Sequence, residues 1–181
     1  SLCGAGARVL VIDDGRSFEH SAKLQGGAFV EFTMSSGFCL NPFSMIDQAQ
    51  AAEDEDYLLD CMAMLKAIIN QMSRHINLLD DTERGLIDGA VNQVWEAHGS
   101  EGSIDLVTEA LEATGNPLAA NLAIAMRPFS SAGTYGRFFQ GQVSFELKAQ
   151  LTVFELSDLS AREELRSVVL TAIMFMSQQM M

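Results

Sequence analysis

Three short apolar segments along the chain have the pattern of buried strands. Residues 8–13 (RVLVID), 28–33 (AFVEFT) and 151–156 (LTVFEL) combine β-branched, aromatic and aliphatic residues in short runs. Such runs, bounded by acids, glycine or serine, are typical of strands in a parallel sheet. We predict three strands, and a short helix that Ser17 caps and that ends before the Gly26-Gly27 pair. The first two strands and this helix would form one βαβ unit.

Helical periodicity dominates the middle of the chain. Between residues 53 and 129, apolar residues recur at spacings of three and four, which is the pattern of helices with one buried face. Acids fill the first turn of this region, where the helix dipole favours them. Asp80 and Glu83 have the spacing of a capping box that starts a further helix. The segment 35–42 is expected to be a loop, either without regular structure or with a short strand around Phe38.

Together these elements predict one α/β domain, or one large piece of one, with a mostly parallel sheet and a large helical insertion. We expect a βαβ part over residues 1–45, a helical part over 50–130, and a strand and helix of the sheet over 145–181. Predicted elements reach close to both ends of the sequence, so we expect the chain to be an internal fragment of a longer protein.

The charge of the chain disfavours two classes of partner. Acidic residues number 24 and basic residues 11, which gives a formal net charge of -13. Binding to nucleic-acid phosphates, or to an anionic membrane surface, requires clustered lysine and arginine. We therefore expect no direct nucleic acid binding, and we interpret the acidity as a means of keeping a rather apolar segment soluble. No apolar run is long enough to span a membrane, and no signal peptide is visible.

The cysteines and histidines do not have the spacing of a metal site. Cys3, Cys39 and Cys61 are widely separated, with no CxxC pair, and the histidines are scattered along the chain without HExxH. We therefore predict no metal site and reduced, cytoplasmic cysteines.

Acidic residues at the ends of two predicted strands are candidates for chemistry. Asp13 and Asp14 end the first strand, where open α/β sheets place their ligand crevice, so they could contact a ribose, magnesium or water. Glu155 and Asp158 hold the corresponding position after the third strand, where a Walker-B-like acid would stand. For both pairs the alternative is a polar turn between a strand and a helix.

Three arginines are candidates for a role at a neighbouring subunit. Arg16 follows the first turn, and Arg127 and Arg137 flank a loop rich in glycine and aromatic residues over 133–141. Any of them could act as an arginine finger in a ring assembly, or serve as an ordinary surface or ion-pair residue. The loop itself predicts either a fixed interaction loop or lid packed on the sheet, or a plain turn region.

No complete catalytic motif is present in the sequence. The phosphate-binding pattern GxxxxGK[ST] does not occur, and the glycine-containing start at residues 3–7 has neither its lysine nor its hydroxyl residue. The nucleophile-elbow pattern GxSxG is also missing.

Five segments, in order, resemble elements of the TraC-type conjugative transfer ATPases. They are 11–18 (VIDDGRSF), 23–32 (KLQGGAFVEF), 39–43 (CLNPF), 133–141 (GTYGRFFQG), and 153–156 (VFEL) with the helix that follows. Each segment is weakly specific alone. Their order over nearly the whole chain makes the set fairly specific. On the basis of this ordered set, the chain is identified as similar to the TraC-type family.

The resemblance implies a partial RecA-like P-loop NTPase domain from a bacterial type IV secretion system. Such ATPases energise pilus assembly and the transfer of DNA or protein. They bind ATP and magnesium, act with other secretion subunits, often as hexamers, and work at the cytoplasmic face of the inner membrane. The Walker A motif would lie before Arg8 and the Walker B strand after Met181. The resemblance therefore implies a segment that is inactive alone, with Glu155 and Arg137 as weak catalytic candidates and Asp13 and Arg16 as weak nucleotide-binding candidates.

Two other functions remain open at the level of sequence. The chain could be a non-enzymatic interaction domain that docks a partner through its helical region, residues 53–129. An unrelated small α/β hydrolytic enzyme has little support, because no nucleophile, base and orienting group can be named.

Overall fold

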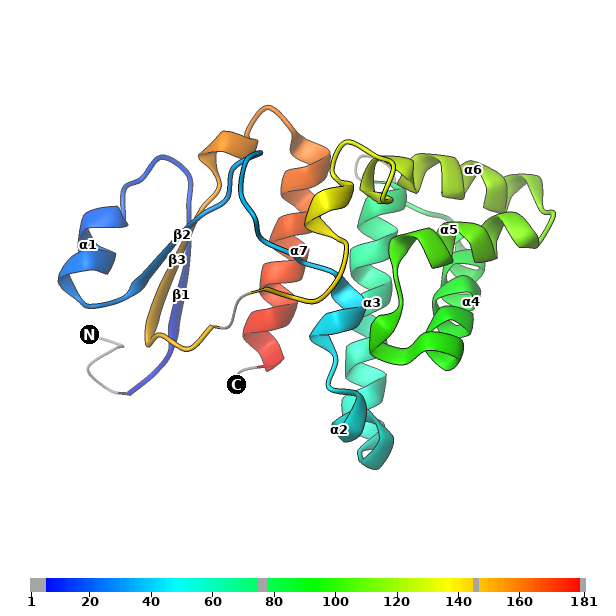
Figure 1. Ribbon diagram of the computed structural model, residues 1–181, viewed down its shortest axis with the longest axis horizontal. Helices are drawn as coiled ribbons and strands as arrows, with labels where there is room; N and C mark the ends of the chain where they lie inside the picture. The colour runs from blue at the N-terminus through cyan, green and yellow to red at the C-terminus, as the bar shows by residue number, and fades with distance from the viewer. Residues whose placement is uncertain (1–5, 75–77, 145–146, 180–181) are drawn as a thin grey trace.

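The chain folds into a small parallel sheet at one end and a group of helices at the other (Figure 1). The computed structural model describes residues 6–74, 78–144 and 147–179. The strands are β1 (Val9–Asp13), β2 (Ala28–Glu31) and β3 (Leu151–Glu155). The helices are α1 (Glu19–Leu24), α2 (Gln48–Glu53), α3 (Glu55–Ser73), α4 (Asp81–His98), α5 (Ile104–Ala113), α6 (Pro117–Met126) and α7 (Glu163–Gln179).

The sheet has the order β1-β3-β2, and both pairings are parallel. The three predicted strands are confirmed, but β1 and β2 do not pair directly as a simple βαβ unit would suggest. The burial of the three strands agrees with this strand order. All five residues of β3 are buried, whereas most residues of β1 and β2 are only partly buried. The central strand is thus the most buried of the three, because both of its edges and both of its faces are covered.

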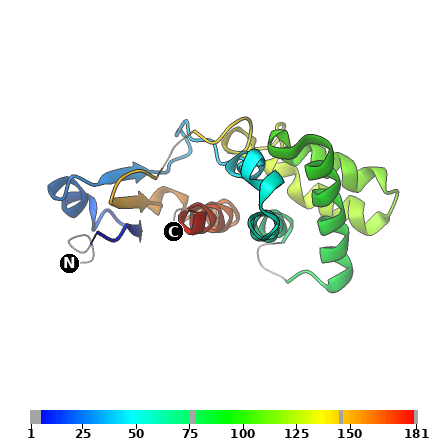
Figure 2. The same ribbon diagram turned by 90° about the horizontal axis from the view of Figure 1, so that it is seen from below.

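Helices cover the two faces of the sheet. On one face Ala22 of α1 packs with Leu151 and Val153 of β3 in a small separate cluster. On the other face Phe154 joins the main core, to which α7 contributes Val168 and neighbouring residues. Figure 2 shows α7 and α3 side by side and nearly end-on, with α7 between the sheet and the remaining helices. Helix α7 thus connects the sheet to the helical part.

Two predicted helix starts have different outcomes. The capping box of α4 is confirmed, because the Glu83 amide donates to the Asp80 carboxylate at 2.8 Å and the Asp80 amide donates back to Glu83 at 2.9 Å. The predicted cap of α1 is wrong: the helix begins at Glu19, after Phe18, and Ser17 caps nothing. The Phe18 amide instead donates to the Asp13 carboxylate at 2.8 Å. A strand-end acid thus binds the amide that immediately precedes the first residue of α1.

The segment around the LNPF motif is a loop without a strand, and it joins three parts of the chain. The buried Asn41 side chain donates through Nδ2 to the Gly102 carbonyl at 3.0 Å and to the Gly141 carbonyl at 2.9 Å. The Leu40 amide donates to the Phe138 carbonyl at 2.6 Å. We call these contacts the Asn41 junction. It ties the connection after β2 to the end of the α4 region and to the aromatic loop.

The aromatic loop, residues 133–141, is packed, as one of the two sequence interpretations proposed. The Phe138 ring lies 5.3 Å from the ring of Phe32, which follows β2. A Cβ at Gly136 would lie 1.9 Å from the Ser130 carbonyl oxygen, so the backbone approaches too closely for any other residue. The Tyr135 hydroxyl donates to Glu164 of α7 at 2.8 Å, and burial followed by this hydrogen bond raises the pKa of Tyr135.

Two further properties concern the described residues alone. None of the helices within them is long and apolar enough to cross a bilayer. Cys39 and Cys61 are free and buried, and burial raises the pKa of both thiols. Cys3 lies outside the described residues.

Replacing Asn41 by alanine should destabilise the fold by about 2–3 kcal/mol, because two carbonyls lose their buried donor. Chemical denaturation of the purified chain measures this. Asn121, exposed on α6, is the matched control: Asn121→Ala should change stability by less than about 0.5 kcal/mol. Equal stabilities of the two variants would contradict a stabilising role for the Asn41 junction.

Gly136→Ala should destabilise the chain by at least about 2 kcal/mol, because the backbone must move to admit the methyl group. Gly89→Ala is the control, since Gly89 is exposed within α4 and a Cβ there would meet no atom within 4 Å. It should stabilise the helix by about 0.5–1 kcal/mol. Thermal unfolding of both variants tests the contrast, and a tolerated alanine at Gly136 would refute the tight packing of the loop.

Candidate functional site

Three carboxylates lie in one row across the carboxyl edge of the sheet. Asp13 at the end of β1 and Glu31 at the end of β2 are both in register with Glu155 of β3. In a parallel sheet the carboxyl ends of the strands meet at one edge, where α/β proteins bind their ligands. The structure therefore brings together two of the acids singled out from sequence, and adds Glu31. Nothing in the sequence pattern marked Glu31, because its role depends on the strand order.

Asp13 is used to organise the turn that follows it. Its side chain is 5% exposed. One carboxylate oxygen accepts from the Asp14 amide at 2.9 Å and the other from the Phe18 amide at 2.8 Å. Both oxygens thus bind the chain between β1 and α1, which is the polar-turn alternative for this residue.

Glu155 is held by backbone amides of the same turn. The Arg16 amide donates to Oε2 at 2.6 Å, the Gly15 amide lies 3.2 Å from Oε1, and the Ser157 amide donates to Oε1 at 2.8 Å. Gly15 has φ 130° and Arg16 has φ 58°, so two successive amides turn toward one anion. Glu155 is 1% exposed.

The surroundings of Glu155 favour its charged form. Burial by itself raises the pKa of this carboxyl, but hydrogen bonds from Ser157, Arg16 and Gly15 outweigh it and hold the pKa below its ordinary value. The pair of amides that could hold an external anion therefore already holds a carboxylate of the chain.

Arg16 lies over this edge with a side chain that is 51% exposed. It forms an ion pair with Glu31 and a second one, at 3.4 Å, with Glu19. Hydrogen bonding from Lys23 is the largest influence on Glu19, whose pKa is lowered. The candidate Arg16 is thus neutralised by two acids from its own neighbourhood.

Arg166 of α7 also reaches the edge, although sequence reasoning did not find it. Its guanidinium donates to Asp14 at 2.9 Å. On the opposite side Asp158 accepts from the Met34 amide at 3.2 Å. Both Asp14 and Asp158, which had been considered for ligand binding, are thus tied to the chain. The contact with Arg166 could not be predicted, because it depends on how α7 packs against the sheet.

Arg137 and Arg127 do not belong to the edge. The Arg137 guanidinium carbon lies 4.8 Å from the centre of the Phe138 ring, and the residue is exposed. Arg127 lies 3.7 Å from Glu112, with both side chains largely exposed. The structure therefore brings Asp13, Arg16 and Glu155 together and leaves Arg137 on the aromatic loop.

The edge does not fit an ATP–magnesium complex on its own. Its carboxylates accept amides of the chain, the two convergent amides hold Glu155, and its arginines are paired with acids. Across residues 6–74, 78–144 and 147–179, no three His, Cys, Asp or Glu side chains are placed to hold a metal ion. Groups from outside this chain would be required to bind the nucleotide.

Glu155→Gln should lower stability by about 2 kcal/mol near neutral pH, because the amide NH₂ would face backbone donors. The folded pKa of Glu155 lies below its ordinary value of 4.5. Its stabilisation is therefore present above that value and is lost as pH falls through the folded pKa. Denaturation of both proteins across this range should show a difference in unfolding free energy that shrinks in acid.

The substitution Arg16→Gly distinguishes the contribution of the Arg16 amide from that of its guanidinium. Glycine keeps the amide and adopts the positive φ readily, and an exposed ion pair contributes little. This variant should keep the acid-dependent loss of stability and stay within about 0.5 kcal/mol of the native chain. If it lost as much as Glu155→Gln, the guanidinium rather than the amide would be the important partner.

Comparison with known proteins gives one informative result. No protein-family model and no curated protein matches the sequence. Among solved structures, VirB4 of Thermoanaerobacter pseudethanolicus is similar, with a TM-score of 0.73 and 18% sequence identity. The match covers 97% of this chain and 70% of that one. At this identity the likeness concerns the fold alone: the chain shares a mixed α/β fold with a segment of VirB4, which agrees with the fold expected from the motif resemblance.

Proposed function

We propose that this chain is an internal segment of the motor domain of a type IV secretion ATPase. The single observation that carries the proposal is agreement between two independent signals. Five ordered motifs resemble the conjugative transfer ATPases, and the fold matches VirB4 over 97% of the chain. In this role the parent protein hydrolyses ATP to energise pilus assembly and the transfer of DNA or protein.

The segment serves the motor as a scaffold. Asp13 and Glu155 fix the turn between β1 and α1 at the edge where a nucleotide would be approached. ATP and magnesium are bound mainly by Walker motifs supplied by the rest of the parent. Arg16 can contact them only by exchanging its acidic partners. The exposed Arg137 is the better candidate to reach a neighbouring subunit of a ring, because no acid holds its guanidinium within the described residues.

The partners and location of the parent follow from the same proposal. It assembles with other secretion subunits, and with further copies of itself as a hexamer. It works in the bacterial cytoplasm against the inner membrane. The segment adds no nucleic-acid contact of its own, since its net charge of -13 opposes binding to phosphates.

The purified chain should release no phosphate from ATP above background when magnesium is present, because neither Walker motif lies within it. A colourimetric phosphate assay over several hours measures this. Turnover that depends on magnesium, and that persists after a further purification step, would show that the chain contains a complete site.

Sequencing the gene on either side of the encoded segment tests the parentage directly. A GxxxxGK[ST] motif should lie upstream of the segment, and a Walker B strand should lie downstream. A native start codon and stop codon at the boundaries of this chain would instead refute the motor assignment.

A further inference from the structure

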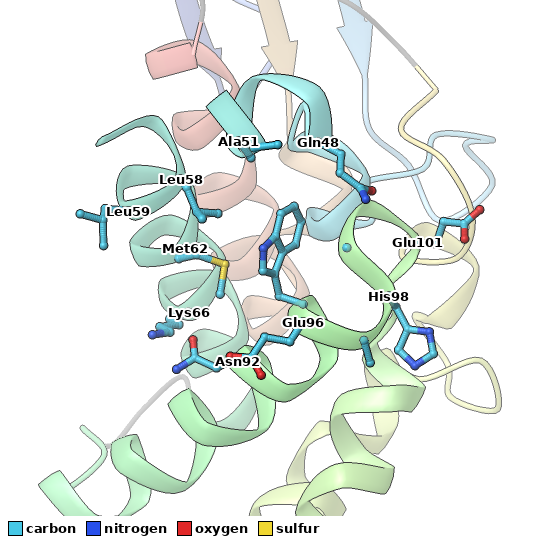
Figure 3. Close-up of a pocket in the computed structure, with 14 residues that line it drawn as sticks. Gln48, Ala51, Leu58, Leu59, Met62, Lys66, Asn92, Glu96, His98 and Glu101 are labelled. Atoms are coloured by element: carbon cyan, nitrogen blue, oxygen red, sulfur yellow. The ribbon is translucent and has the colours of Figure 1, made fainter. Parts of the chain in front are cut away.

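A cleft of about 920 Å³ opens in the helical part, away from the carboxyl edge of the sheet. Figure 3 shows Leu58 and Met62 on α3, Asn92 and Glu96 on α4, and Gln48 of α2 at one end. The chain's single tryptophan, Trp95, also lines this cleft. Its size is in the range of sites that hold a drug-sized molecule or a short peptide segment.

Hydrogen bonds hold one end of the cleft in place. Gln48 Oε1 accepts from the Ser100 hydroxyl at 3.0 Å and from the Ser100 amide at 3.2 Å, which ties α2 to the end of α4. Asp47 caps α2 through the amides of Ala49 and Gln50. An occupant would therefore meet a preformed site, and less ordering entropy would be lost on binding.

Apolar surface lies open along this cleft. Leu59, which lines the cleft, is 60% exposed. It stands one turn before Met62 on α3, and Trp95 faces the cleft from α4 while remaining partly exposed. Large apolar side chains gathered in a groove with a polar rim are typical of a binding surface. A groove between two helices suits the apolar face of a third helix.

The charges around the cleft indicate the sign of the charge that its occupant should carry. Two carboxylates, Glu96 and Glu101, and one ammonium, Lys66, line it. Glu55 and Asp56 are exposed one turn before Leu59 on the same helix. The whole chain carries a net charge of -13. The field of such a chain attracts a cationic segment and repels an anionic one.

We propose that this cleft docks a short amphipathic helix of a partner protein, with apolar residues on one face and lysine or arginine on the flanks. The occupant inserts its apolar face between α3 and α4 against Leu59, Met62 and Trp95. Its basic flank pairs with Glu96, Glu101 and the acids at the start of α3. A second copy of this chain is disfavoured as the occupant, because two strongly acidic surfaces repel each other. This inference is independent of the motor assignment.

Trp95 provides a direct readout for the test. The probe is a synthetic helical peptide of roughly 14 residues with leucine at i, i+3, i+4 and i+7 and lysine elsewhere, free of tryptophan. Titrating it into the folded chain at about 0.15 M salt should change the Trp95 fluorescence saturably. A peptide with glutamate in place of lysine should bind at least about tenfold more weakly. Absence of a saturable change, or equal binding of both peptides, would overturn the proposal.

Matched variants separate this cleft from general attraction to an acidic protein. Leu59→Ser should weaken binding of the lysine peptide about tenfold, whereas Leu24→Ser should not, although Leu24 is 74% exposed. Glu96→Lys should weaken it more than Glu109→Lys, which changes the net charge equally on α5. Circular dichroism checks that each variant is folded. Equal effects within either pair would show that the peptide binds elsewhere and would refute the cleft as its binding site.

Sedimentation of the chain alone tests whether a second copy of the chain occupies the cleft. The proposal requires that Leu59→Ser leave the oligomeric state unchanged. A dimer of the native chain that this substitution dissociates would show that a second copy fills the cleft, and would overturn the assignment to a basic helix.

Discussion

The buried amide of Asn41 is the contact on which the arrangement of the chain depends. Through one NH₂ group it binds the Gly102 carbonyl after α4 and the Gly141 carbonyl of the aromatic loop. Loss of the Asn41 amide would leave the buried Gly102 carbonyl without its donor, which is strongly disfavoured, so the three segments fix one another. Gly102 also admits the Phe43 ring, since a Cβ there would lie 2.4 Å from it. The junction thereby orients the sheet, the aromatic loop and the cleft together.

Elements governed by local pattern could be predicted from the sequence, whereas contacts between distant segments could not. Helix α3 and the Asp80–Glu83 capping box follow from spacing within one stretch of chain. The position of β3 between β1 and β2 depends on pairing between strands far apart in the sequence. The binding of Glu155 by the Arg16 amide depends on that order, and so was not predictable. Motif resemblance marked the segment 39–43, which contains Asn41, although it did not predict the contacts of that side chain.

The carboxyl edge and the cleft play different roles in this account. At the edge, Asp13 and Glu155 are satisfied by the chain itself, which fits a scaffold whose nucleotide-binding groups lie elsewhere in a larger motor. At the cleft, Leu59 is largely exposed and Trp95 partly exposed, and both lie near the acids Glu96 and Glu101, which fits a surface that gains a partner. Helix α7 shares a core with Phe154 of the sheet and packs against α3, and its Arg166 side chain binds Asp14 at the edge. Continuous packing therefore lies between the edge and the cleft.

Hydrogen exchange, followed amide by amide on the native chain, tests the central role of the Asn41 junction most directly. The Leu40 amide, bound to Phe138, and the Val143 amide, bound to Ser44, lie on either side of it. If the junction holds the fold together, both should exchange with the same opening free energy as core amides of β3 and α3. Exchange of these two amides at a much lower free energy, while β3 and α3 stay protected, would contradict the account.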